Sequence, residues 1–118
     1  MKEGIMMFGN KTDKMRHMVD KNEWDKLLKK YGTLTTEEKI QLAEACGTTD
    51  ADDACNMLIT LVKESDKQIQ LAAVKSLAIV GSQNAKTTLL WLIGNLTEDK
   101  ADLKAPMLAA VEKIGNRK

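Results

Sequence analysis

The residue types that most often carry catalysis or metal binding are few in this chain of 118 residues. It has one histidine, His17, and two cysteines, Cys46 and Cys55, with eight residues between them. A zinc site needs four ligands at characteristic spacings, and a nucleophile needs a base and an orienting group that are not evident around His17. We therefore expect no catalytic residue, no metal ligand, no cofactor and no enzymatic activity, with His17 at or near the surface.

The two thiols leave two interpretations open. Cys46 and Cys55 are reduced, small core residues in the first, and in the second they face each other across a helical hairpin as a redox pair. The core interpretation is preferred.

An acidic cluster at Asp50, Asp52 and Asp53 has some of the ligands that calcium prefers. It lacks the loop glycine and the distal glutamate of an EF-hand. Carboxylates are also favourable at the start of a helix, where they interact with the helix dipole. We expect these residues to begin a helix.

Composition describes an ordinary globular chain, with 43% apolar and 30% charged residues. Eighteen basic and seventeen acidic side chains nearly cancel, so we expect no tight nucleic-acid binding. The apolar run Ile5–Phe8 is far shorter than a signal sequence core or a membrane span. We expect a cytoplasmic protein without membrane association, in which residues 1–11 form an N-terminal extension.

Apolar residues recur three and four positions apart from residue 12 onward, which predicts helices and no strands. The expected helices cover residues 12–20, 23–31, 36–46, 51–63, 66–80, 84–96 and 101–114. Thr35–Glu38 and Ser65–Gln68 have the pattern of a capping box, in which a hydroxyl and a carboxylate or amide bond the first backbone N–H groups. Further N-caps are expected at Asn22, Asp50 and Thr97.

The sequence repeats itself with a period of 34 residues, the distance that separates Gly47, Gly81 and Gly115. We expect each glycine to end a helix in the left-handed conformation. When the three segments are aligned on these glycines, the matched positions are apolar residues that a helix would bury. The helices that follow the first two segments match each other in the same way. The matched sets are Ile40, Val74 and Leu108; Ala43, Leu77 and Val111; Cys46, Val80 and Ile114; Ala51 and Ala85; Cys55 and Leu89; Leu58 and Leu92; Ile59 and Ile93; Val62 and Leu96.

The stretch LAAVKSLAIVGSQNAKTTLLWLI (residues 71–93) resembles the HEAT or HEAT-like, armadillo-type repeat, in which an Ala-rich first helix ends at Ile/Val-Gly and a second follows at once. The tetratricopeptide repeat has the same period but needs aromatic residues that this chain lacks. The resemblance implies an all-α fold, a right-handed α-solenoid of antiparallel helix pairs. One domain, residues 12–118, would contain a degenerate unit (12–32), two full units (33–66 and 67–100) and a half unit (101–118).

The candidate binding residues lie on the side of the second helices opposite to the buried stripe. A solenoid commonly uses this side to bind partners, and a tryptophan there would expose a large apolar ring. Gly94, three residues after Trp91, would leave a notch beside the ring. We expect a protein or peptide partner to contact Met57, Thr60, Thr87, Leu90, Trp91 and Gly94.

Two alternatives remain open at this site. Trp91 could instead pack on a neighbouring helix of the same chain. The face could also bind nucleic acid, as in HEAT-like DNA repair proteins, although Asp52 and Asp53 on that side oppose it.

The last unit has no second helix, so the apolar side of residues 101–114 would be uncovered. Its expected exposed residues are Leu108, Ala109, Val111 and Ile114. We expect either a symmetric homodimer or a partner protein to cover this edge.

Overall fold

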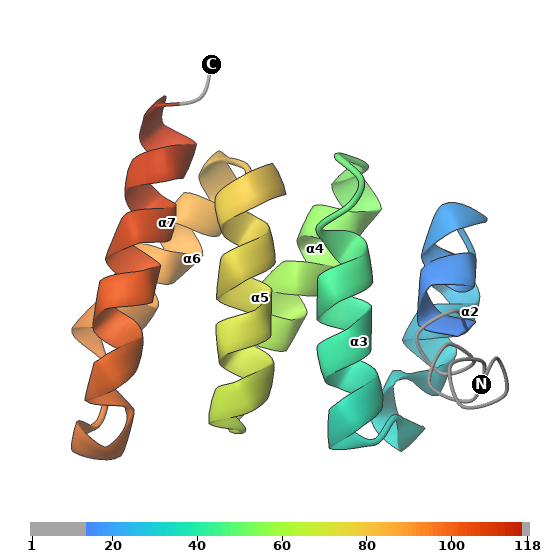
Figure 1. Ribbon diagram of the computed structural model, residues 1–118, viewed down its shortest axis with the longest axis horizontal. Helices are drawn as coiled ribbons and strands as arrows, with labels where there is room; N and C mark the ends of the chain where they lie inside the picture. Colours follow the sequence, from blue (N-terminus) through green and yellow to red (C-terminus); the bar gives the residue numbers. More distant parts are fainter. Residues whose placement is uncertain (1–13, 117–118) are drawn as a thin grey trace, which may run out of the picture.

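The computed structural model describes residues 14–116, which form helices and short connections with no strand among them (Figure 1). The expected all-α class is confirmed. Residues 14–20 are helical, and the expected extension at residues 1–11 lies outside the described residues. The other elements are α2 (Trp24–Lys30), the 3-10 helix η1 (Tyr31–Thr33), α3 (Thr36–Cys46), α4 (Asp52–Val62), α5 (Lys67–Val80), α6 (Gln83–Gly94), the 3-10 helix η2 (Glu98–Leu103) and α7 (Lys104–Asn116).

The helices from α3 onward form two layers. Figure 1 shows α3, α5 and α7 side by side in one row, with α4 and α6 behind them. In the first layer α5 packs between α3 and α7, while in the second α4 contacts α6. No helix among residues 14–116 has the length and apolar character needed to cross a bilayer.

The second helix of each expected unit packs closely on the first helix of the next one. Helix α4 packs on both α3 and α5. Helix α6 packs on α7 and contacts α4, but it does not pack closely on α5. The connection explains this difference between the two units. Gly81 and Ser82 join α5 to α6 with extended backbone, which directs α6 away from α5, whereas residues 47–51 join α3 to α4.

The helix starts follow the sequence only in part. The Thr35 capping box is confirmed: Thr35 Oγ1 accepts from Glu38 N at 3.1 Å, and Thr35 N donates to Glu38 Oε1 at 2.9 Å. The box expected at Ser65 is wrong, because Asp66 caps α5 by accepting from Gln68 N at 2.8 Å. The carboxylate of Asp66 thus caps the helix in place of the Ser65 hydroxyl, one residue later than expected.

The other expected N-caps do not cap helices through their side chains. Asn22 adopts a left-handed backbone (φ 58°), and its Oδ1 accepts from Trp24 Nε1 at 3.2 Å. Helix α4 has Ala51 as its N-cap, so Asp50 lies before it. Thr97 precedes η2 but bonds the Asp99 carboxylate rather than a backbone N–H.

The repeating glycines do not have the role expected from the sequence. None has a positive φ, and Gly115 lies inside α7. Close packing explains the other two: a Cβ on Gly47 would lie 2.5 Å from Ser76 Oγ, and one on Gly81 would lie 2.5 Å from Leu77 O and 2.8 Å from Ile114 Cδ1. These glycines therefore let helix ends of the first layer approach their neighbours.

Most matched apolar positions are buried in α3 and α5, where Ile40 and Val80 are only partly buried, and the buried side is shifted in α7. Ala43, Val74 and Leu77 are fully buried. In α7 the buried positions are Met107, Ala110 and Ile114, whereas Leu108 is 45% exposed and Val111 only partly buried. Helix α7 packs on both α5 and α6, and this pair of neighbours selects a different side of the helix. The expected exposure of Ile114 is therefore wrong.

The glycine contacts make a prediction about stability. Gly81→Ala should lower the free energy of unfolding by about 1–3 kcal/mol, since its methyl group would overlap the backbone oxygen of Leu77 and crowd the Ile114 side chain. Gly94→Ala is the matched control, because nothing lies within 4 Å of its added Cβ and alanine favours the helix by up to about 1 kcal/mol. Urea denaturation of both variants measures the difference. Equal effects of the two substitutions would contradict the packing role of Gly81.

Candidate functional site

The cysteines are core residues in the structure. Cys46 and Cys55 are both buried with free thiols, and Cys55 Sγ lies 3.4 Å from Ser82 Oγ. Burial, together with the nearby Cys55, raises the pKa of Cys46 to about 12. A thiol that stays protonated near neutral pH is a poor nucleophile, which favours the core interpretation over a redox pair. His17 is exposed. Within residues 14–116, no three His, Cys, Asp or Glu side chains form a group that could hold a metal ion.

The outer side of α6 exposes most of the candidate binding residues. Trp91 is 65% exposed and Leu90 is 49% exposed, while Thr87 and Gly94 are also exposed. Ala85 and Leu89 are the fully buried residues of this helix. The alternative in which Trp91 packs on a neighbouring helix is therefore wrong, and its ring lies mainly in solvent.

Space is available around the Trp91 ring. A Cβ added to Gly94 would meet no atom within 4 Å, which agrees with a notch beside the ring. On the other side, an open hollow of about 440 Å³ is lined by Lys63, Thr87, Thr88 and Trp91. Lys63 caps the C-terminal end of α4, so the hollow lies where α4 and α6 meet.

The two α4 residues of the candidate site, Thr60 and Met57, differ in exposure. Thr60 is exposed, and its hydroxyl donates to Asn56 O at 3.2 Å within the helix. Met57 is only 3% exposed, so the expectation that it contacts a partner is wrong. Met57 lines the crevice between α2 and α4 together with Trp24 and Leu28, and no local pattern of the sequence indicates this contact between distant segments.

Together these residues form one surface, which we call the second-layer face. It runs from Leu28 on α2, which is 61% exposed, across α4 to Trp91 on α6. The exposed strip of α4 between them is polar. The second-layer face consists of Leu28, Asp53, Asn56, Thr60, Lys63, Thr87, Leu90, Trp91 and Gly94.

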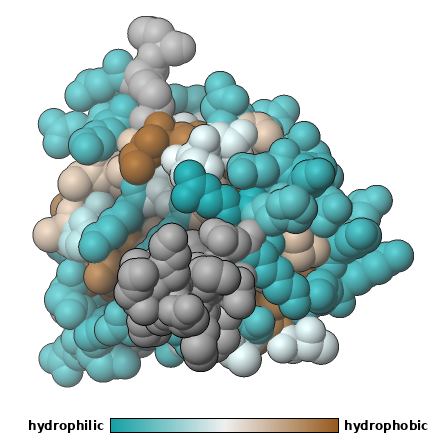
Figure 2. Space-filling model, turned by 45° about the vertical axis from the view of Figure 1, so that its right-hand side comes forward, coloured by the Kyte–Doolittle hydropathy of each residue, from teal (hydrophilic) through white to brown (hydrophobic). Residues whose placement is uncertain are grey.

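Large apolar side chains are exposed in few other places among the described residues. They are Ile79 on α5, at 63%, and Leu108 on α7. The view of Figure 2, which brings the α2 end forward, shows mostly hydrophilic atoms with separate hydrophobic areas. Scattered apolar residues are normal on a soluble surface, and Leu90 and Trp91 are the adjacent pair among the large exposed apolar residues of the described range 14–116.

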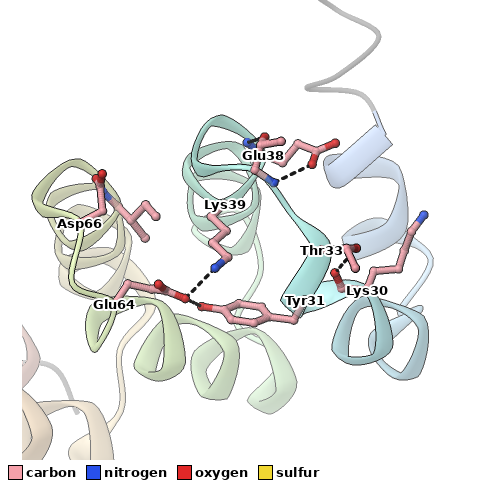
Figure 3. A network of polar contacts seen from close by, with 9 residues as sticks. Lys30, Tyr31, Thr33, Glu38, Lys39, Glu64 and Asp66 are labelled. Atoms are coloured by element: carbon pink, nitrogen blue, oxygen red, sulfur yellow. Dashed lines mark hydrogen bonds and ion pairs between the residues drawn. The ribbon is translucent and has the colours of Figure 1, made fainter.

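A polar cluster that the sequence analysis missed joins three elements (Figure 3). The Tyr31 hydroxyl, from η1, donates to the Glu64 carboxylate that follows α4. Lys39 of α3 donates to the same carboxylate at 2.9 Å, and its Nζ lies 4.6 Å from the centre of the Tyr31 ring. The side chains of Lys39 and Glu64 are only 16% and 23% exposed. The cluster therefore ties η1 and α3 to the end of α4.

The acidity of these groups follows from their contacts. Hydrogen bonds from Tyr31 and then from Lys39 hold the pKa of Glu64 below its usual value. Burial and the bond to Glu64 raise the pKa of Tyr31. A neutral tyrosine, an ionised carboxylate and a lysine form a satisfied structural contact. The partners lie 25 and 33 residues apart, so no local sequence pattern could reveal them.

Comparison with family models, with curated proteins and with solved structures finds no match to this chain. The resemblance to HEAT-like repeats thus rests on the residues of the sequence alone.

The polar cluster predicts a pH-dependent contribution to stability. Tyr31→Phe should lower the free energy of unfolding by about 1–2 kcal/mol at neutral pH, because a hydrogen bond to a charged acceptor is lost. Since the pKa of Glu64 is lowered in the folded state, this contribution is present above the ordinary glutamate pKa of about 4.3 and is lost as pH falls through the lower folded value. Denaturation of wild type and variant at several pH values measures it. A difference that stays constant down to pH 2 would contradict this account.

The exposure of Trp91 predicts a small effect on folding. Trp91→Ala should change the free energy of unfolding by no more than about 0.5 kcal/mol, as is usual for an exposed side chain. Thermal or urea denaturation of the variant measures this. A loss of about 3–5 kcal/mol, typical of a core aromatic residue, would place the ring inside the folded chain instead.

Proposed function

We propose that this protein is a non-catalytic interaction module that binds a protein or peptide partner on the second-layer face. The observation that carries the proposal is the 65% exposure of Trp91 beside Leu90 and the open space at Gly94. Tryptophan is among the residues that contribute most to protein interfaces, and leaving its ring in water is unfavourable.

The architecture that we propose for this module is a HEAT-like, right-handed α-solenoid of antiparallel helix pairs. The 34-residue period and the two layers, α3–α5–α7 and α4–α6, support it (Figure 1). In such a stack the second helices line the inner surface, which is the usual place for a partner. The second-layer face would be that surface.

Charges near Trp91 favour a protein over a nucleic acid as the partner. The second-layer face has one basic residue, Lys63, and the acidic Asp53, with Asp52 adjacent. A surface that neutralises phosphates needs several basic residues together. Tight binding to duplex DNA at physiological salt is therefore not expected.

A homodimer is the second form that the partner could take. Of the edge residues of α7, Leu108 and Ala109 are exposed and Val111 is half-buried, while Ile114 is buried. The uncovered apolar edge is thus smaller than the sequence suggests. This weakens the argument for a dimer through α7, and a different protein is the preferred partner.

The test is a quantitative affinity capture with tagged wild type, Trp91→Ala and Ile79→Ala, followed by mass spectrometry. Ile79 is the matched control, because its side chain is 63% exposed on α5 in the other layer. We expect at least one protein to be lost with Trp91→Ala and retained with Ile79→Ala, since truncation of an interfacial tryptophan costs about 2 kcal/mol or more.

Identical captures by all three proteins would contradict the proposal. Light scattering over a dilution series tests the dimer separately. A wild-type dimer that dissociates in Trp91→Ala would make a second copy of the chain the partner.

A further inference from the structure

We propose that the second-layer face binds one amphipathic helix, which lies across α4 with one apolar residue against Leu28 and another against Trp91. This inference rests on the proposed function and specifies the chemistry of the partner. The two exposed apolar side chains lie on either side of the polar strip of α4. They are two separate anchor points rather than one continuous apolar groove.

A helical ligand follows from the backbone of the receptor. Residues 14–116 include no strand, so this part of the chain offers no sheet edge to which an extended peptide could bond. The N–H and C=O groups within α4 are used by that helix itself. An extended ligand lying on it would bond its backbone groups only to water or to side chains, whereas a helix satisfies its own backbone groups and is the favoured form.

The charges beside the anchors give the ligand a direction. Lys63 shares the hollow of Trp91, and Asp53 lines the crevice with Leu28. Neither has an ion pair within residues 14–116. An acidic residue near Lys63 and a basic residue near Asp53 would complete both. A helix prefers acidic residues in its first turn and basic ones in its last, so its N-terminus would lie over α6 and its C-terminus over α2.

The arrangement of the helices sets the spacing of the two apolar residues. Neighbouring helices pack about 8–10 Å apart, so two such steps from α2 to α6 amount to roughly 16–20 Å. A helix rises about 1.5 Å per residue and returns to the same side after about eleven residues. The two apolar residues should thus lie about three turns apart, with small polar residues between them opposite Asn56 and Thr60.

The charges at Asp53 and Lys63 also suit the ends of their own helix, because Asp53 lies in the first turn of α4 and Lys63 caps its last. If the two charges act only on their own helix, changing them alters the stability of the protein and leaves its choice of peptide unchanged. Exchanging the two charges separates the roles, since only a docking role reverses the preferred direction of a peptide.

The experiment is selection from a display library of Ala-rich helical peptides of about twenty residues. The library varies the charges of the first and last turns and the apolar positions along one side. Peptides enriched on the full-length wild type over Trp91→Ala are then synthesised. Their affinities are measured by fluorescence anisotropy against wild type, Leu28→Ala, Trp91→Ala, the control Ile79→Ala and the double variant Asp53→Lys/Lys63→Glu, after each is shown to be folded by circular dichroism.

We expect enriched peptides with an acidic first turn, a basic last turn and apolar residues about eleven positions apart. Their affinity should fall at least about tenfold with Leu28→Ala and with Trp91→Ala, and should not change with Ile79→Ala. The charge-exchanged protein should prefer the peptide with reversed charges.

Peptides that need Trp91 but ignore Leu28 or the two charges would overturn this inference and leave the proposed function in place. A library that yields no peptide dependent on Trp91 would also overturn it, and the proposed function would then be judged by the protein capture. A wild-type protein that sediments as a dimer through Trp91 would overturn it in favour of a second copy.

Discussion

Close approach between the helices of the first layer is the constraint on which the rest of the structure depends. Gly47 lies so near Ser76 that no side chain fits, and the Ser76 hydroxyl donates to Ala43 O at 2.7 Å. A Cβ on Gly81 would lie 2.8 Å from Ile114 Cδ1 of α7. These contacts join α3 to α5 and α5 to α7, which fixes the row that Figure 1 shows. A methyl group at either glycine would displace the atoms packed against it.

The position of α4 and α6 follows from that row. Both helices bury one side against first-layer helices, at Leu58 and Leu61 in α4 and at Leu89 in α6. Their outer sides are then free of that layer, and Trp24 and Leu28 of α2 line a crevice with α4 beside Met57. Trp91 is therefore exposed on a helix whose own position is fixed by packing. An aromatic side chain has only two torsions to fix when it binds, so it loses little conformational freedom for its contact area.

The sequence predicted those features that depend on neighbouring residues. Helix positions, the Thr35 cap and the burial of Val74 and Leu77 follow from periodicity and capping chemistry. The place of Trp91 opposite the buried stripe of α6 also follows from periodicity, whereas the sequence leaves open whether a neighbouring helix covers the ring.

Features that depend on contacts between distant segments could not be predicted. The sequence marks Gly47 and Gly81 as special but does not say that space, rather than a left-handed backbone, requires them. Met57 is buried and lies beside Trp24 and Leu28 of α2. The bond from Tyr31 to Glu64 joins residues 33 positions apart. Each of these depends on the three-dimensional packing of elements that no local pattern relates.

The central claim is that the Trp91 ring lies in solvent on a rigid helix and is free to bind. The chain has two tryptophans, and Trp24 is only 8% exposed, so it serves as an internal reference. Acrylamide quenching of the Trp24→Phe protein reports on Trp91 alone, and quenching of Trp91→Phe reports on Trp24. The account predicts that Trp91 is quenched nearly as fast as a free tryptophan derivative and several times faster than Trp24. Equal protection of the two rings would contradict it.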